Sequence, residues 1–239
     1  MTEFSAQRDT YERLHELLDD TNLDAIAGIA GCAPAIGRLN YLDDATLASL
    51  VDRTAIVAGA RVLDVGCGRG FLGRWLLAHG HRVAYTAVDY AAPALAAVRR
   101  HLPDATIVHG DASDVAGTYD AIFLVESVWS VDDALAARLQ AATVPGGRVA
   151  IALSSLDDAH DLRVDATIAA LVKAGFTVGR VELAADHAKI AGLLCAATLI
   201  EGHAHPWVRE RMAAEAGRTL AALRDGAFRS DVLVAAART

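Results

Sequence analysis

The sequence predicts an α/β fold: a doubly wound, Rossmann-like seven-stranded sheet with a helical lid inserted between the last two strands. Apolar, strand-like runs alternate with helix-like segments from Arg61 to about Leu153, and such alternation is typical of a parallel sheet covered by helices. A glycine-rich turn follows the first of these runs. A chain of 239 residues with 54% hydrophobic content can build one large core, so we expect a single domain over residues 1–239.

Amphipathic periodicity predicts helices on both sides of this alternating region. Gln7–Asp19 and Ala45–Arg53 would form an N-terminal helical cap over residues 1–54, ahead of a ligand-binding core over residues 55–153. Beyond the core, the expected elements are a helix at Asp161–Ala174 and strands at Phe176–Leu183 and Ser230–Ala237. Residues 184–229 separate these two strands, far more than a hairpin needs. We therefore expect a lid there, with a helix from Pro206 to about Arg224.

The most informative stretch is Val62–Gly70, an apolar strand that leads into three alternating glycines. These are Gly66, Gly68 and Gly70. Glycine allows positive φ and lets the backbone come close to a ligand. The spacing also satisfies the G-x-G-x-x-G pattern of dinucleotide-binding folds, but Asp64 at the end of the strand would repel a pyrophosphate and attract an ammonium group. The turn therefore predicts a nucleotide-like ligand that carries a cationic group.

The stretch Leu63–Gly70 resembles the first motif of the class I S-adenosylmethionine-dependent methyltransferases, whose cofactor has such an ammonium at its methionine end. A later run, Thr143–Leu153, is similar to the Pro-Gly-Gly-Arg turn and strand of that family. The resemblance covers residues 55–153 by motif and residues 175–239 by layout alone. It implies S-adenosylmethionine as the cofactor.

Two further strands end in acids that would serve this cofactor. Asp89 closes a short buried strand roughly twenty residues after the glycines and can accept both ribose hydroxyls, although it could also cap the helix Ala91–Arg100. Tyr90 could lie flat on adenine or pack in the core. Asp111, followed by Ala112 after the strand at Thr106, stands where the family meets the adenine amino group, although Gly-Asp is also an ordinary turn.

The segment Glu126–Ser130 follows the apolar strand Tyr119–Val125. It resembles a small-molecule methyltransferase subgroup that has Glu-Ser-x-x-His, but Ser130 stands where the histidine would be. Serine is no base at neutral pH without help. Glu126 is therefore expected to bind the cofactor, orient the acceptor or act as base. Alternatively, His187 or His203 of the lid is the base, or the reaction needs no strong base. Trp129 and Ser130 are expected to face the substrate.

Polar and aromatic residues of the lid and cap complete the predicted site. His203, His205 and Trp207 are candidate substrate contacts, with surface histidines as the ordinary alternative. Tyr41 lies in a segment that loosely resembles the tyrosine-bearing entrance of natural-product methyltransferases, where the phenol covers the sulfonium, although a tyrosine between helices can equally pack on the core. His203 and His205 lack a third plausible ligand, so we expect no metal.

Composition narrows the classes of partner and compartment. The formal net charge is -8, which argues against a protein that tracks a nucleic-acid backbone. Three widely spaced cysteines without a C-x-x-C pair indicate reduced thiols. The N-terminus lacks signal-peptide features, and the apolar run Ile190–Ile200 is shorter than the roughly twenty residues that cross a bilayer. We expect a cytoplasmic protein with no membrane or nucleic-acid partner that can form homo-oligomers.

The resemblance implies methyl transfer to a small, largely apolar acceptor, through oxygen, nitrogen or carbon, in natural-product biosynthesis. Ser130 keeps one rival open: a cyclase or isomerase that binds S-adenosylmethionine as a fixed positive charge and transfers no methyl group. A non-catalytic partner subunit with the same fold is a second rival, which the intact glycine turn and its acids disfavour. A nicotinamide dehydrogenase is the third.

Overall fold

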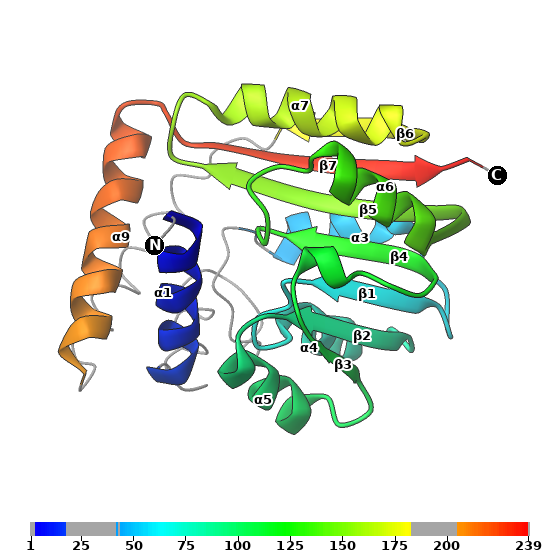
Figure 1. Ribbon diagram of the computed structural model, residues 1–239, viewed down its shortest axis with the longest axis horizontal. Helices are drawn as coiled ribbons and strands as arrows, with labels where there is room; N and C mark the ends of the chain where they lie inside the picture. Colours follow the sequence, from blue (N-terminus) through cyan, green and yellow to red (C-terminus); the bar gives the residue numbers. More distant parts are fainter. Residues whose placement is uncertain (1–2, 18–41, 43, 183–204, 239) are drawn as a thin grey trace.

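The computed structural model describes residues 3–17, 42, 44–182 and 205–238 of the chain. Seven strands form one sheet in the order β3-β2-β1-β4-β5-β7-β6 (Figure 1). The strands are β1 (Arg61–Val65), β2 (Ala84–Asp89), β3 (Thr106–His109), β4 (Tyr119–Val125), β5 (Thr143–Ser155), β6 (Phe176–Glu182) and β7 (Arg229–Ala237). Neighbours from β3 to β5 run parallel, whereas β7 is antiparallel to both β5 and β6. The predicted Rossmann-like, seven-stranded α/β sheet is confirmed, whereas the helical lid stays a prediction.

Helices surround this sheet. They are α1 (Glu3–Leu17), α3 (Asp44–Thr54), α4 (Phe71–Ala78), α5 (Ala92–His101), the 3-10 helix η1 (Ala112–Asp114), α6 (Asp133–Ala142), α7 (His160–Lys173) and α9 (Pro206–Arg224). Side chains of α3, α4 and α5 share one buried cluster with the sheet, and those of α6 and α7 share the other. None of these helices combines the length and apolar character that a membrane-spanning helix needs.

Alternation along the central strands supplies the two halves of the core. In β4, Phe123 packs with the α3 side of the sheet, whereas Ile122 and Leu124 pack with the α6 side. All three are fully buried, because successive side chains of a strand point to opposite faces and both faces are covered. The central parallel strands are therefore held in place on both faces, and their carboxyl ends lie at one edge of the sheet.

The observed elements differ from the predicted ones mainly at their ends. Helix α1 begins at Glu3 and ends at Leu17, and α9 spans Pro206–Arg224 as predicted. Residues 183–204, the first part of the expected lid, lie outside the described residues. The Pro-Gly-Gly turn is drawn into β5, which already begins at Thr143, and the pairing with β4 shifts register there. Such an irregularity adds residues to one strand without ending the pairing.

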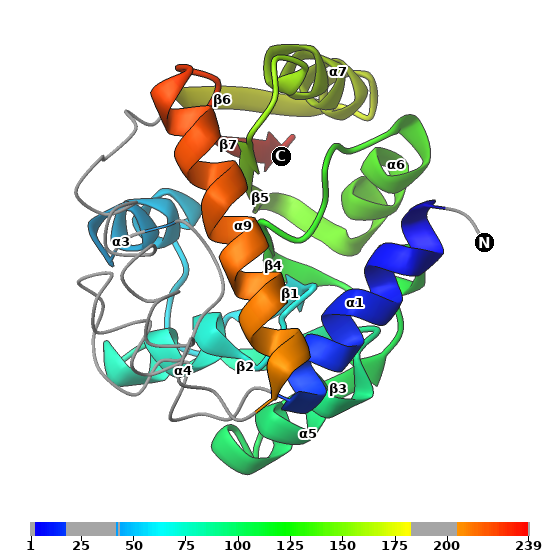
Figure 2. The same ribbon diagram turned by 90° about the vertical axis from the view of Figure 1, so that its left-hand side faces the viewer.

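Helices α1 and α9 lie across the edge where the parallel strands end, on the side to which their arrowheads point (Figures 1 and 2). Ligands of open α/β sheets bind outside the carboxyl ends of the strands. These two helices, which are far apart in the sequence, therefore both border the candidate site.

Candidate functional site

The glycine turn after β1 is held in a shape that only glycine adopts easily. Gly66, Gly68 and Gly70 have φ values of 70°, 53° and 77°, a region in which a side chain is strained. The N–H groups of Gly66 and Cys67 donate to the carbonyl oxygen of Val88 at 2.8 and 3.0 Å. Because the turn is fixed by these hydrogen bonds and carries glycines without side chains, its backbone can come close to a ligand.

Asp89 ties this turn to the start of α5. Its Oδ2 accepts from the N–H of Gly68 at 2.7 Å, and its Oδ1 accepts from the N–H of Ala91 at 2.8 Å. The side chain is buried, and burial raises the pKa of Asp89 against the lowering effect of these backbone donors. Ala91 itself is the N-cap of α5, so Asp89 holds the turn rather than capping the helix. A carboxylate offers about four acceptor positions, so Asp89 keeps acceptor capacity for a ligand beside these backbone donors.

Asp64 lies at the bottom of the site, only 1% exposed. Its Oδ2 accepts a hydrogen bond of 2.5 Å from the hydroxyl of Tyr85 on β2. Burial raises the pKa of Asp64 to about 7, while the Tyr85 hydrogen bond opposes the shift and nearby Asp89 adds to it. One carboxylate oxygen is therefore engaged within the protein. Tyr85 was not among the predicted site residues, because only the pairing of β1 with β2 brings it there.

Asp111 and Tyr90 are brought together by a residue that the sequence analysis missed. Nη1 of Arg8, on α1, lies 3.3 Å from Oδ2 of Asp111, and the Arg8 guanidinium carbon lies 4.6 Å from the centroid of the Tyr90 ring. Oδ1 of Asp111 accepts from the backbone N–H of Ser113 at 2.8 Å and also from its hydroxyl. These Ser113 donors, more than Arg8, lower the pKa of Asp111. Ala112 follows as the first residue of η1.

Glu126 has a strained backbone at the end of β4. Its φ of 51° lies in the left-handed region, which non-glycine residues adopt mainly where the surroundings impose it. Oε1 of Glu126 accepts from the Ser154 hydroxyl at 2.6 Å, and Ser154 in turn lies 2.9 Å from the Ser230 hydroxyl. The carboxylate is therefore turned toward the ends of β5 and β7. A functional requirement is one reason for such strain to be kept.

The predicted substrate residues are spread over the edge of the sheet. Trp129 is 54% exposed, with the Arg163 guanidinium carbon 5.8 Å from its ring centroid, and Ser130 is exposed. His205 is the N-cap of α9. The Arg13 guanidinium of α1 lies 4.8 Å from the centroid of the Trp207 ring, so Trp207 contributes to the contact between α1 and α9. Substrate roles for these residues stay predictions.

Three other predicted residues, Tyr41, His187 and His203, lie outside the described residues. In the part of the chain that the structure describes, no three His, Cys, Asp or Glu side chains gather closely enough to hold a metal ion. Cys67, inside the glycine turn, is a buried free thiol.

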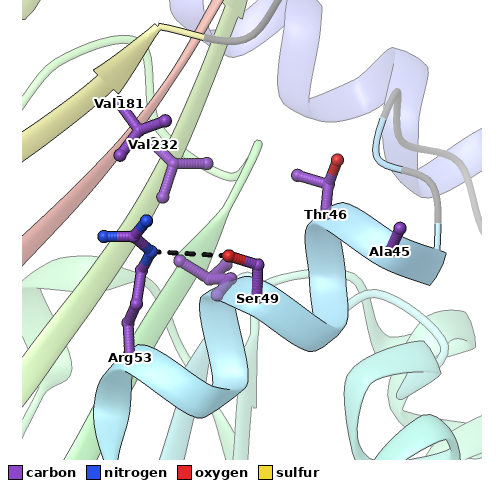
Figure 3. Close-up of a pocket in the computed structure, with 7 residues that line it drawn as sticks. Ala45, Thr46, Ser49, Arg53, Val181 and Val232 are labelled. Atoms are coloured by element: carbon purple, nitrogen blue, oxygen red, sulfur yellow. Dashed lines mark hydrogen bonds between the residues drawn. The ribbon is translucent and has the colours of Figure 1, made fainter.

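A cavity of about 260 Å³ lies beside this region, between α3 and the ends of β6 and β7 (Figure 3). Its lining includes Ala45, Thr46, Ser49, Leu50, Val181 and Val232. Arg53 completes it, and its Nε lies 3.4 Å from the Ser49 hydroxyl. Val232 stands two residues after Ser230 on β7, so both face the α3 side of the sheet. The cavity contains none of the predicted site residues. Its Val232 is, however, a near neighbour along β7 of Ser230, which contacts Ser154, the residue that donates to Glu126.

Comparison with known proteins gives one family match and several partial relatives. Residues 62–147 match the family model described as a methyltransferase domain. The chain is 43% identical over 134 residues to ribosomal RNA small subunit methyltransferase C of Chromohalobacter salexigens, which covers 49% of this chain and 39% of that protein. It is 34% identical over 109 residues to a ubiquinone biosynthesis O-methyltransferase of Aromatoleum aromaticum, covering 41% and 46%. The chain thus spans less than half the length of these curated relatives.

Solved structures share the fold over most of the chain. Phosphoethanolamine N-methyltransferase 2 of Haemonchus contortus, in complex with phosphomonomethylethanolamine and S-adenosylhomocysteine, has a TM-score of 0.69 and 18% identity, over 92% of this chain and 58% of that one. The (4+2) cyclase SpnF has a TM-score of 0.67 and 17% identity, over 90% and 92%. At such identities the likeness concerns the fold alone.

Proposed function

We propose, from the premise that residues 62–147 form a methyltransferase domain of the class I, S-adenosylmethionine-dependent type, that this chain transfers a methyl group to a small, largely apolar acceptor. The observation that carries the proposal is the glycine turn that Asp89 ties to α5 above the buried Asp64. We also propose a role in secondary metabolism, because Glu126–Ser130 resembles the small-molecule subgroup.

The residues present fit this cofactor better than a dinucleotide. Carboxylates at the ends of β1 and β2 and just beyond β3 face the site, namely Asp64, Asp89 and Asp111. They suit an ammonium, two ribose hydroxyls and an adenine amino group, whereas a pyrophosphate would be repelled. Asp64 would use its second oxygen for the ammonium, since Tyr85 holds the first. The adenine amino group would share Oδ2 of Asp111 with Arg8 or displace that guanidinium.

The bound sulfonium supplies an already activated methyl group, so the protein has to align an acceptor and exclude water. Helices α1 and α9 cover the edge of the sheet where this would happen (Figure 2). Glu126 can accept the proton of a hydroxyl or ammonium acceptor, because Ser154 holds one of its oxygens and fixes its direction. An acceptor methylated on carbon in an electron-rich ring would need less of this help.

Two observations support this acceptor class, namely the net charge of the chain and a cavity between α3 and strands β6 and β7. The cavity next to the Ser154–Ser230 pair is lined mainly by small and apolar side chains, and the net charge of -8 disfavours long contacts with RNA phosphates. One relative is nevertheless named for ribosomal RNA, so RNA has to be tested as an acceptor.

The test of the acceptor class uses methyl-labelled S-adenosylmethionine with a panel of apolar phenols, amines and polyenes, and separately with ribosomal RNA. We expect label in a small product, with one S-adenosylhomocysteine formed for each methyl group; label in RNA alone would contradict the acceptor class.

A second candidate is the cyclase or isomerase, favoured by Ser130 in place of a histidine and by the fold shared with a (4+2) cyclase. The same incubation separates the two functions. Conversion of a substrate without release of S-adenosylhomocysteine would support the cyclase and contradict methyl transfer.

Glu126→Gln should slow turnover by about a hundredfold if Glu126 is the base, which is the lower end of what general acid–base catalysis contributes. The cofactor Kd should not change, because glutamine keeps the size and one acceptor oxygen. Steady-state rates and calorimetry measure the two quantities. Ser230→Ala, which removes a group in contact with Ser154 rather than Glu126, is the control and should cost less. Full turnover in Glu126→Gln would exclude the base role, and a weakened Kd would assign Glu126 to the cofactor site.

Cofactor affinity should fall as the pH drops below about 7, because Asp64 has its pKa raised to about 7 and becomes neutral below it. A neutral carboxyl no longer attracts the ammonium, whereas above this pH the carboxylate does. Calorimetric titrations at pH 6 and pH 8 should differ by about tenfold, as linkage to one proton requires. In Asp64→Asn the affinity should be weaker and this difference should vanish. Equal affinity of the unmodified protein at both pH values would contradict the ammonium assignment.

A further inference from the structure

Helix α1 directs polar side chains at the site at helical spacing. Arg8, Tyr11 and His15 stand at positions i, i+3 and i+7 of the helix, so they share one face. Arg8 contacts Asp111 and Tyr90 near the end of β3. The helix crosses the carboxyl ends of the strands (Figure 2), so its other end reaches the glycine turn.

His15 is the residue at that end. Its Cε1 and Nε2 lie 3.6 and 3.9 Å from the point that a Cβ on Gly68 would occupy. The backbone carbonyl of His15 accepts a hydrogen bond of 3.1 Å from Nη1 of Arg69, a buried residue of the same turn. The imidazole therefore rests against the glycine turn, with a guanidinium beside it.

The side chain of His15 is partly exposed, and its ring is neutral and incompletely hydrogen-bonded. Nδ1 of His15 is buried and has no hydrogen-bond partner among the residues that the structure describes. Burial, with a smaller effect of Arg69, lowers the pKa of His15 to about 4. A neutral ring can carry its proton on Nδ1 as a donor. Buried polar atoms in native proteins nearly always have a partner, so this one points to a ligand that supplies it.

The charges around His15 indicate which group of the cofactor would accept the hydrogen bond from Nδ1. The amino-acid end of S-adenosylmethionine carries an ammonium and a carboxylate. Asp64 and Asp89 form the negative side of the turn, whereas Arg69 supplies a positive charge beside His15. The ammonium would be repelled by Arg69, and the carboxylate is attracted to it.

We propose that His15 is a cofactor-binding residue whose Nδ1–H donates to the α-carboxylate of S-adenosylmethionine, with the Arg69 guanidinium as the opposite charge. This inference rests on the proposed function, because it assigns one more contact to the same cofactor. It makes α1 part of the binding site at both of its ends, since Arg8 borders the adenine side.

The test compares S-adenosylmethionine with decarboxylated S-adenosylmethionine, which keeps the ammonium but lacks the carboxylate. Calorimetric titrations use the full chain and three variants. His15→Phe keeps a ring against Gly68 and removes the nitrogen, and His15→Gln restores an N–H donor. Glu16→Ala alters the next, exposed residue of α1 and is the control.

His15→Phe should bind S-adenosylmethionine about tenfold more weakly, as expected for a lost hydrogen bond to a charged group, and should bind the decarboxylated analogue as the unmodified protein does. His15→Gln should regain part of the difference, and Glu16→Ala should match the unmodified protein. A loss in His15→Phe that is equal for both ligands, or no loss, overturns the inference. If the unmodified protein binds neither ligand, the proposed function fails first.

Discussion

Gly66→Ala should abolish measurable cofactor binding and lower the free energy of unfolding by about 2–5 kcal/mol, the sum of left-handed backbone strain and overpacking. Gly66 has a φ of 70°. A Cβ added there would lie 2.3 Å from Cβ of Ser127, a contact that real side chains do not make. The turn would have to move, and the backbone that faces the ligand would move with it, together with the hydrogen bonds that anchor the turn to Val88. Thermal unfolding and calorimetric titration measure the two effects.

Gly80→Ala is the matched control for this change. Gly80 also has a left-handed φ, 80°, but a Cβ there would meet nothing within 4 Å. It should cost only about 1–2 kcal/mol of stability, the strain of the backbone alone, and leave cofactor affinity unchanged. Cofactor binding by Gly66→Ala at the level of the control would contradict the account of the turn.

Asp89→Ala should weaken cofactor binding about tenfold to a hundredfold, the range for losing a partner of buried polar groups. Loss of the ribose acceptor is one reason for the weaker binding, and the structure adds a second. The N–H groups of Gly68 and Ala91 both donate to this carboxylate, so the turn and the start of α5 lose their common anchor. Calorimetry with S-adenosylhomocysteine measures the affinity, and the melting temperature should fall as well.

Asp104→Ala, at an exposed position ahead of β3, serves as the control for removing an acid. It should keep both affinity and stability. Asp89→Asn should fall between, because its amide oxygen can replace one acceptor while its NH2 group faces a backbone donor. An Asp89→Ala protein with unchanged affinity would remove the ribose assignment.

The core of the fold could be predicted because its signals are local. In Val62–Gly70 the strand, the acid and the glycines follow one another directly, and the unbroken apolar run Ala121–Val125 is typical of a strand buried on both faces. Each acid after a strand must reach the same edge of a parallel sheet. The order of these signals therefore indicates a site before any contact is known.

The second half of the site depends on contacts between distant segments. Ser154 and Ser230 are separated by 76 positions and meet because β5 and β7 pair antiparallel. Arg8 and Asp111 are 103 positions apart. His15 belongs to an amphipathic helix in which one polar side chain resembles any other until the helix is docked. No spacing rule finds such residues from one sequence.

The central claim is that the glycine turn and its acids bind S-adenosylmethionine. The most direct test is calorimetric titration of the purified chain with S-adenosylmethionine, S-adenosylhomocysteine and NAD, after mass spectrometry has shown whether a ligand co-purifies. The account predicts that the first two bind to one site in each chain and that NAD does not bind. Binding of NAD alone would contradict the role of Asp64, and binding of none of the three would contradict the claim itself.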